Sequence, residues 1–252
     1  MLPFLHLGPI TLATYGLLVA TGLLVSFFVL RADLNRRRLS ADPHTIIGLT
    51  GLTGLVGAKL YHVLESPAEF FAQPIRLLFS QVGFAWFGGL LAGLLTLLLL
   101  ARHYRMPALQ MLDVASPAAA LGYGIGRLGC LISGDGDYGI PTTLPWGLAF
   151  PNGLVPTTER VHPTPIYEFL VAVVLFYFLW RLGARALRDR RPSGLVFANF
   201  LFWSGLARFL VEYIRLNPPW LFGLTNAQVA SLLCIVAGVF LLLRLRAQVK
   251  QT

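Results

Sequence analysis

Long apolar runs separated by short polar links dominate the pattern of the chain. Seven windows are apolar over most of a helical circumference, and each approaches the length of about 20 residues that a helix needs to cross a bilayer. We therefore predict an all-α, polytopic membrane protein that forms a single integral membrane domain over residues 1–252. The predicted transmembrane helices are residues 9–30, 45–64, 84–100, 108–125, 165–180, 194–211 and 224–243, of which the fourth is interrupted by Asp113, Ser116 and Pro117.

Basic residues are concentrated in alternate links of this pattern. The links after the first, third and fifth predicted helices and the tail after the seventh hold 14 of the 20 Lys and Arg residues. Under the positive-inside rule these segments are cytoplasmic. The N-terminus and the long link 129–164 are then outside the cell and the C-terminus is cytoplasmic. The 14 residues are Arg31, Arg36, Arg37, Arg38, Arg102, Arg105, Arg181, Arg185, Arg188, Arg190, Arg191, Arg244, Arg246 and Lys250.

Composition supports the membrane assignment. Hydrophobic residues make up 56% of the chain and charged residues only 12%, whereas a soluble domain carries roughly 25% charged residues. This excludes an ordinary cytosolic enzyme, a disordered tail and a nucleic-acid-binding module, despite the net charge of +9. The two cysteines, Cys130 and Cys234, lack C-x-x-C spacing, and we expect neither a metal nor a cofactor.

Two arginines lie within or at the ends of apolar runs. An arginine at the centre of a membrane helix costs on the order of 2.5–3.5 kcal/mol, so Arg127 and Arg208 indicate function unless they extend outward to the interface. Arg208, Glu212 and Arg215 follow helical spacing at i, i+4 and i+7. An Arg208–Glu212 salt bridge is one interpretation. Since Glu212 cannot neutralise both arginines, surplus positive charge favours an anion site.

Glycines and polar residues indicate where this site opens. Arg127 lies in a glycine-rich segment that allows close approach of a backbone or a lipid head group. Glycines 48, 51, 54 and 57 indicate close helix packing. Lys59 is ambiguous between bonds to carbonyl groups and a substrate contact. We interpret the link 129–164 as an external cap over a cavity that opens to the outer leaflet, with Thr164 as the N-cap of the next helix.

Several short motifs, in order along nearly the whole chain, resemble the bacterial prolipoprotein diacylglyceryl transferase family. The sequence GRLGCLISGD over residues 126–135 is similar to the family signature G-R-x-G-N-x-x-N-G-E. His162-Pro163-Thr164 with Tyr167-Glu168 is similar to its H-P-[ST]-Q-L-Y-E motif. Further matches are Gly8-Pro9 with Tyr15-Gly16, Gly57-Ala58-Lys59, Gly88-Gly89, and Arg208 with Glu212 and Arg215; the departures are Phe87, Cys130, Ser133, Asp135 and Pro165.

The resemblance implies that the diacylglyceryl group of phosphatidylglycerol passes to the lipobox cysteine thiol of a prolipoprotein signal peptide. The site would face the outer leaflet of the bacterial inner membrane. We predict that Arg127 and Arg208 stabilise the departing glycerol phosphate. The candidates for a base are His162, Glu212 and Tyr15, in that order. Predicted substrate-binding residues are Arg127, Gly129, Cys130, Ser133, Asp135, Gly88, Gly89, Lys59 and Arg215.

Two alternative functions belong to other classes. The substituted signature is compatible with a non-catalytic or altered-acceptor homologue that binds lipid. An anion transporter with Arg127 and Arg208 as its selectivity site is disfavoured, because the seven unequal runs show no internal repeat.

Overall fold

The structure, a computed structural model, describes residues 1–80 and 83–249. The chain forms two compact units, which are described separately. The first comprises Met1–Leu30 and Asp113–Thr252, and the second comprises Arg31–Leu112. The boundaries between the units fall within two helices, α1 (Thr14–Arg37) and α6 (Ala108–Ser133).

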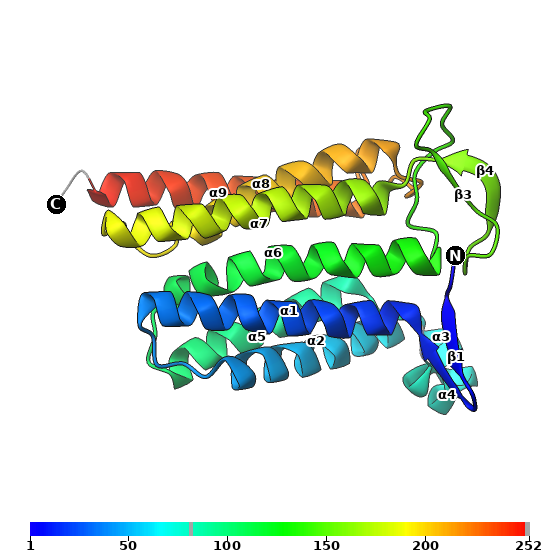
Figure 1. The fold of residues 1–252 in the computed structure, drawn as a ribbon, viewed down its shortest axis with the longest axis horizontal. Helices are drawn as coiled ribbons and strands as arrows, with labels where there is room; N and C mark the ends of the chain where they lie inside the picture. The colour runs from blue at the N-terminus through cyan, green and yellow to red at the C-terminus, as the bar shows by residue number, and fades with distance from the viewer. Residues whose placement is uncertain (81–82, 250–252) are drawn as a thin grey trace. The chain divides into compact units, whose positions relative to one another are not determined.

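The first unit is a helical bundle with two small β-hairpins. Besides parts of α1 and α6 it contains α7 (Thr164–Arg188), α8 (Leu195–Val211), the 3-10 turn η1 (Glu212–Ile214) and α9 (Asn226–Val249). Helices α7 and α8, and α8 and α9, pack side by side (Figure 1). A buried cluster of Ala120, Leu175, Leu179 and Val196 joins α6, α7 and α8.

Small residues permit close helix contacts in this unit. A Cβ atom at Gly122 of α6 would collide with Ser26 of α1, whose hydroxyl donates a hydrogen bond to the carbonyl of Ala118 (3.0 Å). A Cβ atom at Gly124 would lie 2.8 Å from Cβ of Ala172 in α7. The glycines before Arg127 therefore bring the neighbouring helices close to the end of α6, as the sequence indicates.

Both hairpins lie next to helix ends of the first unit. Strands β1 (Phe4–Leu7) and β2 (Ile10–Ala13) pair antiparallel immediately before α1. Strands β3 (Leu148–Phe150) and β4 (Thr157–Val161) pair antiparallel between α6 and α7. Tyr138 stacks on Phe150, with ring centroids 5.1 Å apart, and both contact Val161. The segment predicted as a cap is thus folded around a small apolar core of its own.

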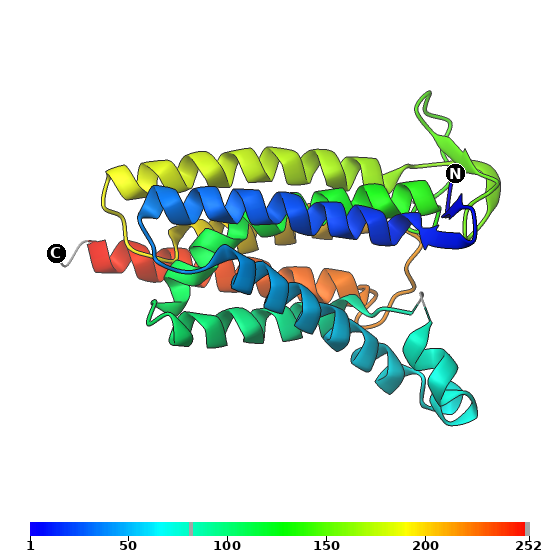
Figure 2. The ribbon, with the colours of Figure 1, turned by 60° about the horizontal axis from the view of Figure 1, so that its bottom comes forward.

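The second unit contains α2 (Pro43–Glu65), α3 (Pro67–Ala72), α4 (Pro74–Phe79) and α5 (Trp86–His103). The side chain of Asp42 caps α2 by accepting hydrogen bonds from the amides of His44 and Thr45. Helices α2 and α5 lie side by side (Figure 2). The predicted role of the α2 glycines in packing is confirmed for Gly57, because a Cβ atom there would lie 2.6 Å from the carbonyl oxygen of Gly88.

Six helices in residues 1–80 and 83–249 are long and apolar enough to cross a membrane. They overlap six of the seven predicted runs, in agreement with a mostly helical, polytopic membrane protein. Helix α6 has 26 residues, but Asp113, Ser116 and Arg127 reduce its hydropathy and it is not among the six. A seventh span and the orientation stay predictions. The six are Thr14–Arg37, Pro43–Glu65, Trp86–His103, Thr164–Arg188, Leu195–Ile214 and Asn226–Gln248.

Several predicted boundaries are wrong. Residues 9–13 belong to the first hairpin, because Gly8 turns the chain at a φ of 62° before the helix begins. Helix α6 continues to Ser133, so the link that follows it begins at residue 134 and not at 129. Thr164 is the first residue of α7 and its N-cap is Pro163. The Thr164 hydroxyl instead donates a hydrogen bond to the carbonyl of Asp137 (2.5 Å).

Candidate active site

Three arginines and three carboxylates converge in the first unit. Arg127 comes from the end of α6, Arg208 from the end of α8, and Arg215 from the residue after η1. Their ion-pair partners lie in the loop after α6, in the first turns of α7 and in η1. These partners are Asp137, Glu168 and Glu212. We call these six residues the charged cluster.

Glu168 lies at the centre of the charged cluster. Its carboxylate is paired with Arg127 (Oε2 to Nη2, 2.5 Å), Arg208 (Oε1 to Nη1, 3.4 Å) and Arg215 (Oε2 to Nη1, 3.4 Å). The hydroxyl of Tyr123, one turn before Arg127, donates a further hydrogen bond to Oε1 (2.6 Å). A buried carboxylate needs several such partners. Glu168 therefore fixes the positions of all three arginines.

Asp137 bridges two of the arginines. Its Oδ2 pairs with Nη1 of Arg127 and its Oδ1 with Nη2 of Arg215. Burial acts to raise the pKa of Asp137, but the two guanidinium groups outweigh burial and lower this pKa to about 2. Asp137 is therefore a carboxylate at neutral pH.

Glu212 holds the C-terminal side of the charged cluster. Its Oε2 pairs with Nη2 of Arg208 (2.8 Å), which confirms the predicted salt bridge, and lies 3.6 Å from Nε of Arg215. Its Oε1 accepts hydrogen bonds from Asn217 (2.6 Å) and Thr225 (2.7 Å). The expected helical stripe is wrong beyond Val211, because the α-helix ends there and a 3-10 turn carries Glu212.

The expectation of surplus positive charge is also wrong. Asp137 and Glu168 supply the two negative charges that Glu212 alone does not, so three cations face three anions. In the sequence Glu168 stands out only as the last residue of a motif, and nothing singles out Tyr123. Asp137 is brought to the arginines by a loop in which Gly134 and Gly136 have φ values of 59° and 93°. The sequence feature that marks this loop is the alternation of glycine and aspartate over residues 134–137.

The signature residues after Arg127 line the same region. Nη1 of Arg127 donates to Sγ of the buried Cys130 (3.4 Å). The buried Ser133 hydroxyl bonds to the carbonyl of Cys130 (3.2 Å), which places it at the end of α6. Asp135 accepts a hydrogen bond from the amide of Asp137 (3.2 Å), and burial together with the neighbouring Asp137 charge raises the pKa of Asp135.

Tyr15 and Gly129 are in contact beside this region. A Cβ atom at Gly129 would lie 3.1 Å from Cδ2 of Tyr15, so the glycine gives room to the tyrosine ring. Tyr15 lies at the start of α1 and is 40% exposed. Tyr15 therefore lies next to the end of α6, whereas its role as a base stays a prediction.

His162 makes its side-chain hydrogen bond away from the arginines. Its Nδ1 lies 3.2 Å from the hydroxyl of Tyr167, which also accepts a hydrogen bond from the indole of Trp146 (2.8 Å). The imidazole is thus held by Tyr167 of α7, and Trp146 of the segment after α6 contacts Tyr167 in turn. Its role as a base stays a prediction.

Three predicted substrate-binding residues belong to the second unit. Gly88 and Gly89 of α5 lie against Gly57 and Gly54 of α2, so helix packing accounts for both. Nζ of Lys59 donates to the hydroxyl (2.8 Å) and the carbonyl (3.0 Å) of Ser80. Lys59 is open to two interpretations in the sequence, bonds to carbonyl groups or a substrate contact, and the structure shows a bond to a carbonyl group. The substrate role of these residues stays a prediction.

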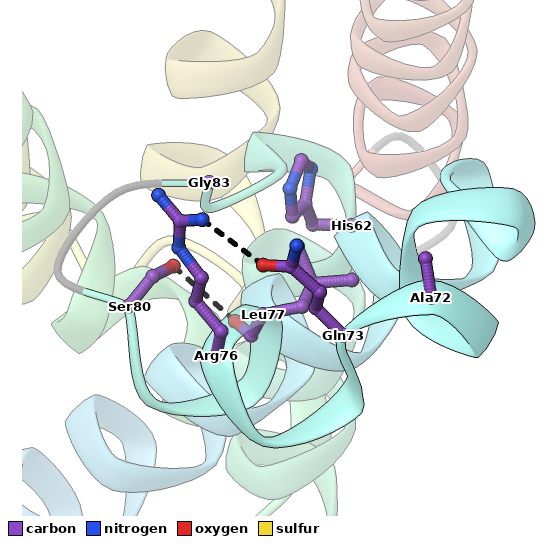
Figure 3. A pocket seen from close by; sticks show the side chains of 7 residues that line it. All are labelled: His62, Ala72, Gln73, Arg76, Leu77, Ser80 and Gly83. Atoms are coloured by element: carbon purple, nitrogen blue, oxygen red, sulfur yellow. Dashed lines mark hydrogen bonds between the residues drawn. The ribbon is translucent and has the colours of Figure 1, made fainter.

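A pocket of about 320 Å³ lies beside Lys59 in the same unit (Figure 3). Its polar lining includes His62, Gln73, Arg76 and Ser80. Arg76 donates a hydrogen bond to the side-chain oxygen of Gln73 (3.0 Å). Short helices that expose Phe71 and Phe79 surround it, as expected for an element at a membrane interface.

Cys130, Asp135 and Asp137 offer ligand atoms within 4.8 Å of one another, the spacing of a metal site. Both oxygens of Asp137 are already paired with arginines, and a metal ion would place another positive charge beside Arg127. These contacts favour an anion in place of a cation at this end of α6.

The comparisons with known proteins identify the family. A sequence model of the family named prolipoprotein diacylglyceryl transferase matches residues 3–244. The chain belongs to the prolipoprotein diacylglyceryl transferase family.

Relatives in this family come from distant bacteria and carry the name phosphatidylglycerol–prolipoprotein diacylglyceryl transferase. The protein of Leptospira interrogans is 30% identical over 92% of this chain and 88% of its own length. The protein of Geobacter sulfurreducens is 34% identical over 84% of this chain and 81% of its own length. The protein of Parasynechococcus marenigrum is 35% identical over 84% of this chain and 78% of its own length. The likeness therefore extends over both units.

Proposed function

We propose that this protein transfers the diacylglyceryl group of phosphatidylglycerol to the lipobox cysteine of prolipoproteins, the first step of lipoprotein maturation. The bond between the acceptor sulfur and a glycerol carbon forms, and the bond from that carbon to the phosphate oxygen breaks. Glycerol phosphate leaves and the thiol loses its proton. The observation that carries the proposal is the three-arginine cluster at the ends of α6 and α8 in a chain of this family.

The charged cluster suits a phosphodiester. Arginine presents a planar fork that bonds two oxygens at once, and such bonds strengthen as charge builds on the leaving phosphate. In our proposal Arg127 and Arg208 stabilise this charge. Glu168, paired with both, is a positioning residue that keeps their forks oriented.

The acceptor thiol needs a thiolate form to attack. A free thiol has a pKa of about 8.5, and guanidinium groups nearby lower it. We propose His162 as the first candidate for the base, because imidazole titrates near neutral pH. Glu212, which pairs with Arg208, is the second candidate and Tyr15 is the third.

The proposed location is the bacterial inner membrane with the charged cluster toward the outer leaflet. The basic links predict this orientation through the positive-inside rule. In this arrangement α6 is a seventh span, and the segment from residue 134 to residue 163 covers the outer ends of the helices.

The test uses purified protein in uncharged detergent with phosphatidylglycerol and a lipobox peptide. We expect a diacylglyceryl mass increase on the peptide cysteine, absent when that cysteine is serine. Arg127→Lys should remove most of the transfer, because one ammonium cannot replace a fork bonded to both Asp137 and Glu168. The exposed Arg188→Lys is the matched control and should retain it.

Two other results would contradict the proposal. Wild-type turnover in Arg127→Lys would remove this arginine from the mechanism. Lipid binding without transfer by the wild-type protein would favour the non-catalytic or altered-acceptor homologue, which the substitutions Phe87 and Cys130 bring into consideration.

A further inference from the structure

Asp137 occupies the position of an anionic ligand between two arginines. One carboxylate oxygen pairs with Arg127 and the other with Arg215. The two non-bridging oxygens of a phosphodiester would bond a pair of guanidinium groups in the same way. We call the facing Nη1 of Arg127 and Nη2 of Arg215 the Arg127–Arg215 anion site.

Of the three acids in the charged cluster, Asp137 is the one able to leave. Its side chain is 32% exposed, whereas that of Glu168 is 6% and that of Glu212 is 0% exposed. Glu168 and Glu212 are also fixed within helical turns. Asp137 lies in a loop, at an edge of the cluster that water reaches.

The main chain of Asp137 is held independently of its carboxylate. Its carbonyl oxygen accepts hydrogen bonds from the Thr164 hydroxyl (2.5 Å) and from Nη1 of Arg215 (3.0 Å). The side chain can therefore turn out to water while the loop stays in place. Such a rotation breaks two ion pairs and leaves the backbone hydrogen bonds intact.

Charge balance favours an exchange over an addition. The cluster holds three guanidinium groups and three carboxylates. A fourth anion beside them would be an uncompensated charge in a mostly buried place, which is costly. Replacing Asp137 by a singly charged phosphodiester keeps the balance. The pKa of Asp137 of about 2 means that protonation does not empty the site near neutral pH.

We propose that Asp137 is a displaceable internal ligand of the Arg127–Arg215 anion site, and that the phosphodiester of phosphatidylglycerol replaces it there. This inference rests on the proposed function. The carboxylate of Asp137 competes with the lipid phosphate for the two arginines. The site therefore binds a singly charged head group that can bond both arginines, and it does not bind a neutral head group. It also keeps the two guanidinium groups paired between turnovers.

The first experiment measures the accessibility of Asp137 in the wild-type protein. A water-soluble carbodiimide with an amine labels exposed carboxylates, and peptide mass mapping locates the label. We expect phosphatidylglycerol to increase labelling of Asp137 several-fold in uncharged detergent. Diacylglycerol, which has the same acyl chains and no phosphate, should not. Unchanged labelling, or protection of Asp137 by phosphatidylglycerol, would overturn the proposal.

A free anion is distinguished from a head group in the same experiment. Inorganic phosphate replaces the lipid at equal concentration, and we expect no increase in Asp137 labelling, because acyl chains are needed to bring the phosphate to the site. An equal increase with inorganic phosphate would assign the site to free phosphate and overturn the assignment to lipid.

The second experiment compares Asp137→Asn with Glu159→Gln, an exposed residue of the same segment that loses the same charge. The measured quantity is the phosphatidylglycerol fraction that half-saturates thermal stabilisation. We expect Asp137→Asn to lower it about tenfold, the factor that corresponds to about 1.4 kcal/mol, and Glu159→Gln to leave it at the wild-type value. A higher half-saturating fraction in Asp137→Asn would make Asp137 a structural residue.

Neither experiment includes an acceptor peptide. If the wild-type protein transfers no lipid, the proposed function fails while displacement of Asp137 by phosphatidylglycerol is still measurable. If transfer occurs and Asp137 stays protected, only the present inference fails.

Discussion

The carboxylate of Asp113 caps α8, whose N-cap residue, Gly194, lies 81 residues later in the chain. It accepts hydrogen bonds from the amide of Gly194 (2.7 Å) and from the amide of Phe197 (2.8 Å). The first amides of a helix lack partners within the helix. The residue that interrupts an apolar run in the sequence thus joins α6 to the start of α8.

Replacing Asp113 tests this connection. Asp113→Ala leaves the amides of Gly194 and Phe197 without these bonds, and we expect a loss of about 1–2 kcal/mol in the free energy of unfolding. Thermal unfolding in detergent would show it as a lower midpoint. The control is Asp189→Ala, whose side chain is 43% exposed. Equal midpoints for the two variants would contradict a stabilising role for the cap.

Glu168 is expected to contribute most to the stability of the charged cluster. Glu168→Gln leaves three guanidinium groups facing two carboxylates, and breaking a buried pair in this way costs on the order of 3–5 kcal/mol. We expect a lower unfolding midpoint and weaker lipid transfer, because all three arginines lose an anchor. Glu159→Gln removes the same charge from an exposed position and should have neither effect. Wild-type stability of Glu168→Gln would show that the ion pairs are dispensable.

Cys130 is not expected to carry the lipid as a covalent intermediate. An alkyl thioether is a poor leaving group, so a diacylglyceryl group on Cys130 would be trapped. Cys130→Ser keeps a small polar side chain beside Arg127 and should retain most of the transfer activity. Intact mass after incubation with phosphatidylglycerol alone checks this. A stoichiometric adduct that disappears on adding peptide would make Cys130 the nucleophile.

The proposed orientation predicts where a fused reporter is active. Alkaline phosphatase joined after Asn152, between β3 and β4, should be active, because it folds only outside the cytoplasm. The same enzyme joined after Arg188 should be inactive, because the basic links are cytoplasmic. The reverse pattern of activities would place the charged cluster at the inner leaflet.

The sequence predicts the membrane helices better than their ends. Apolar length is a local signal, and each predicted run overlaps an observed helix over most of its length. The ends of α7 and α9 extend past the apolar runs, because arginine is a good helix former and extends the helix into the polar region. The first hairpin is missed because strand alternation is hard to recognise where a short segment is continuous with an apolar run.

In the charged cluster, too, the residues marked by a local sequence pattern are predicted, and those brought in by the fold are not. Arg127 and Arg208 are predicted from their unusual placement in apolar runs, and Glu212 and Arg215 from their spacing to Arg208. The four residues are found together. Asp137 reaches them only through a loop conformation that two glycines with positive φ permit. This loop conformation is set by the folded chain. An aspartate in a glycine-rich link belongs to no periodic pattern, so its partners cannot be inferred from the sequence.

The contact between Gly57 and Gly88 has a mechanical consequence for the second unit. Backbone meets backbone there, and the side-chain atoms that adjoin the contact are the Cβ atoms of Ala92 and Tyr61, which cannot change rotamer to absorb a displacement. A shift of α2 along its axis is therefore transmitted to α5. Since His62 follows Gly57 on α2 and lines the pocket beside Arg76, such a shift would also move this wall of the pocket.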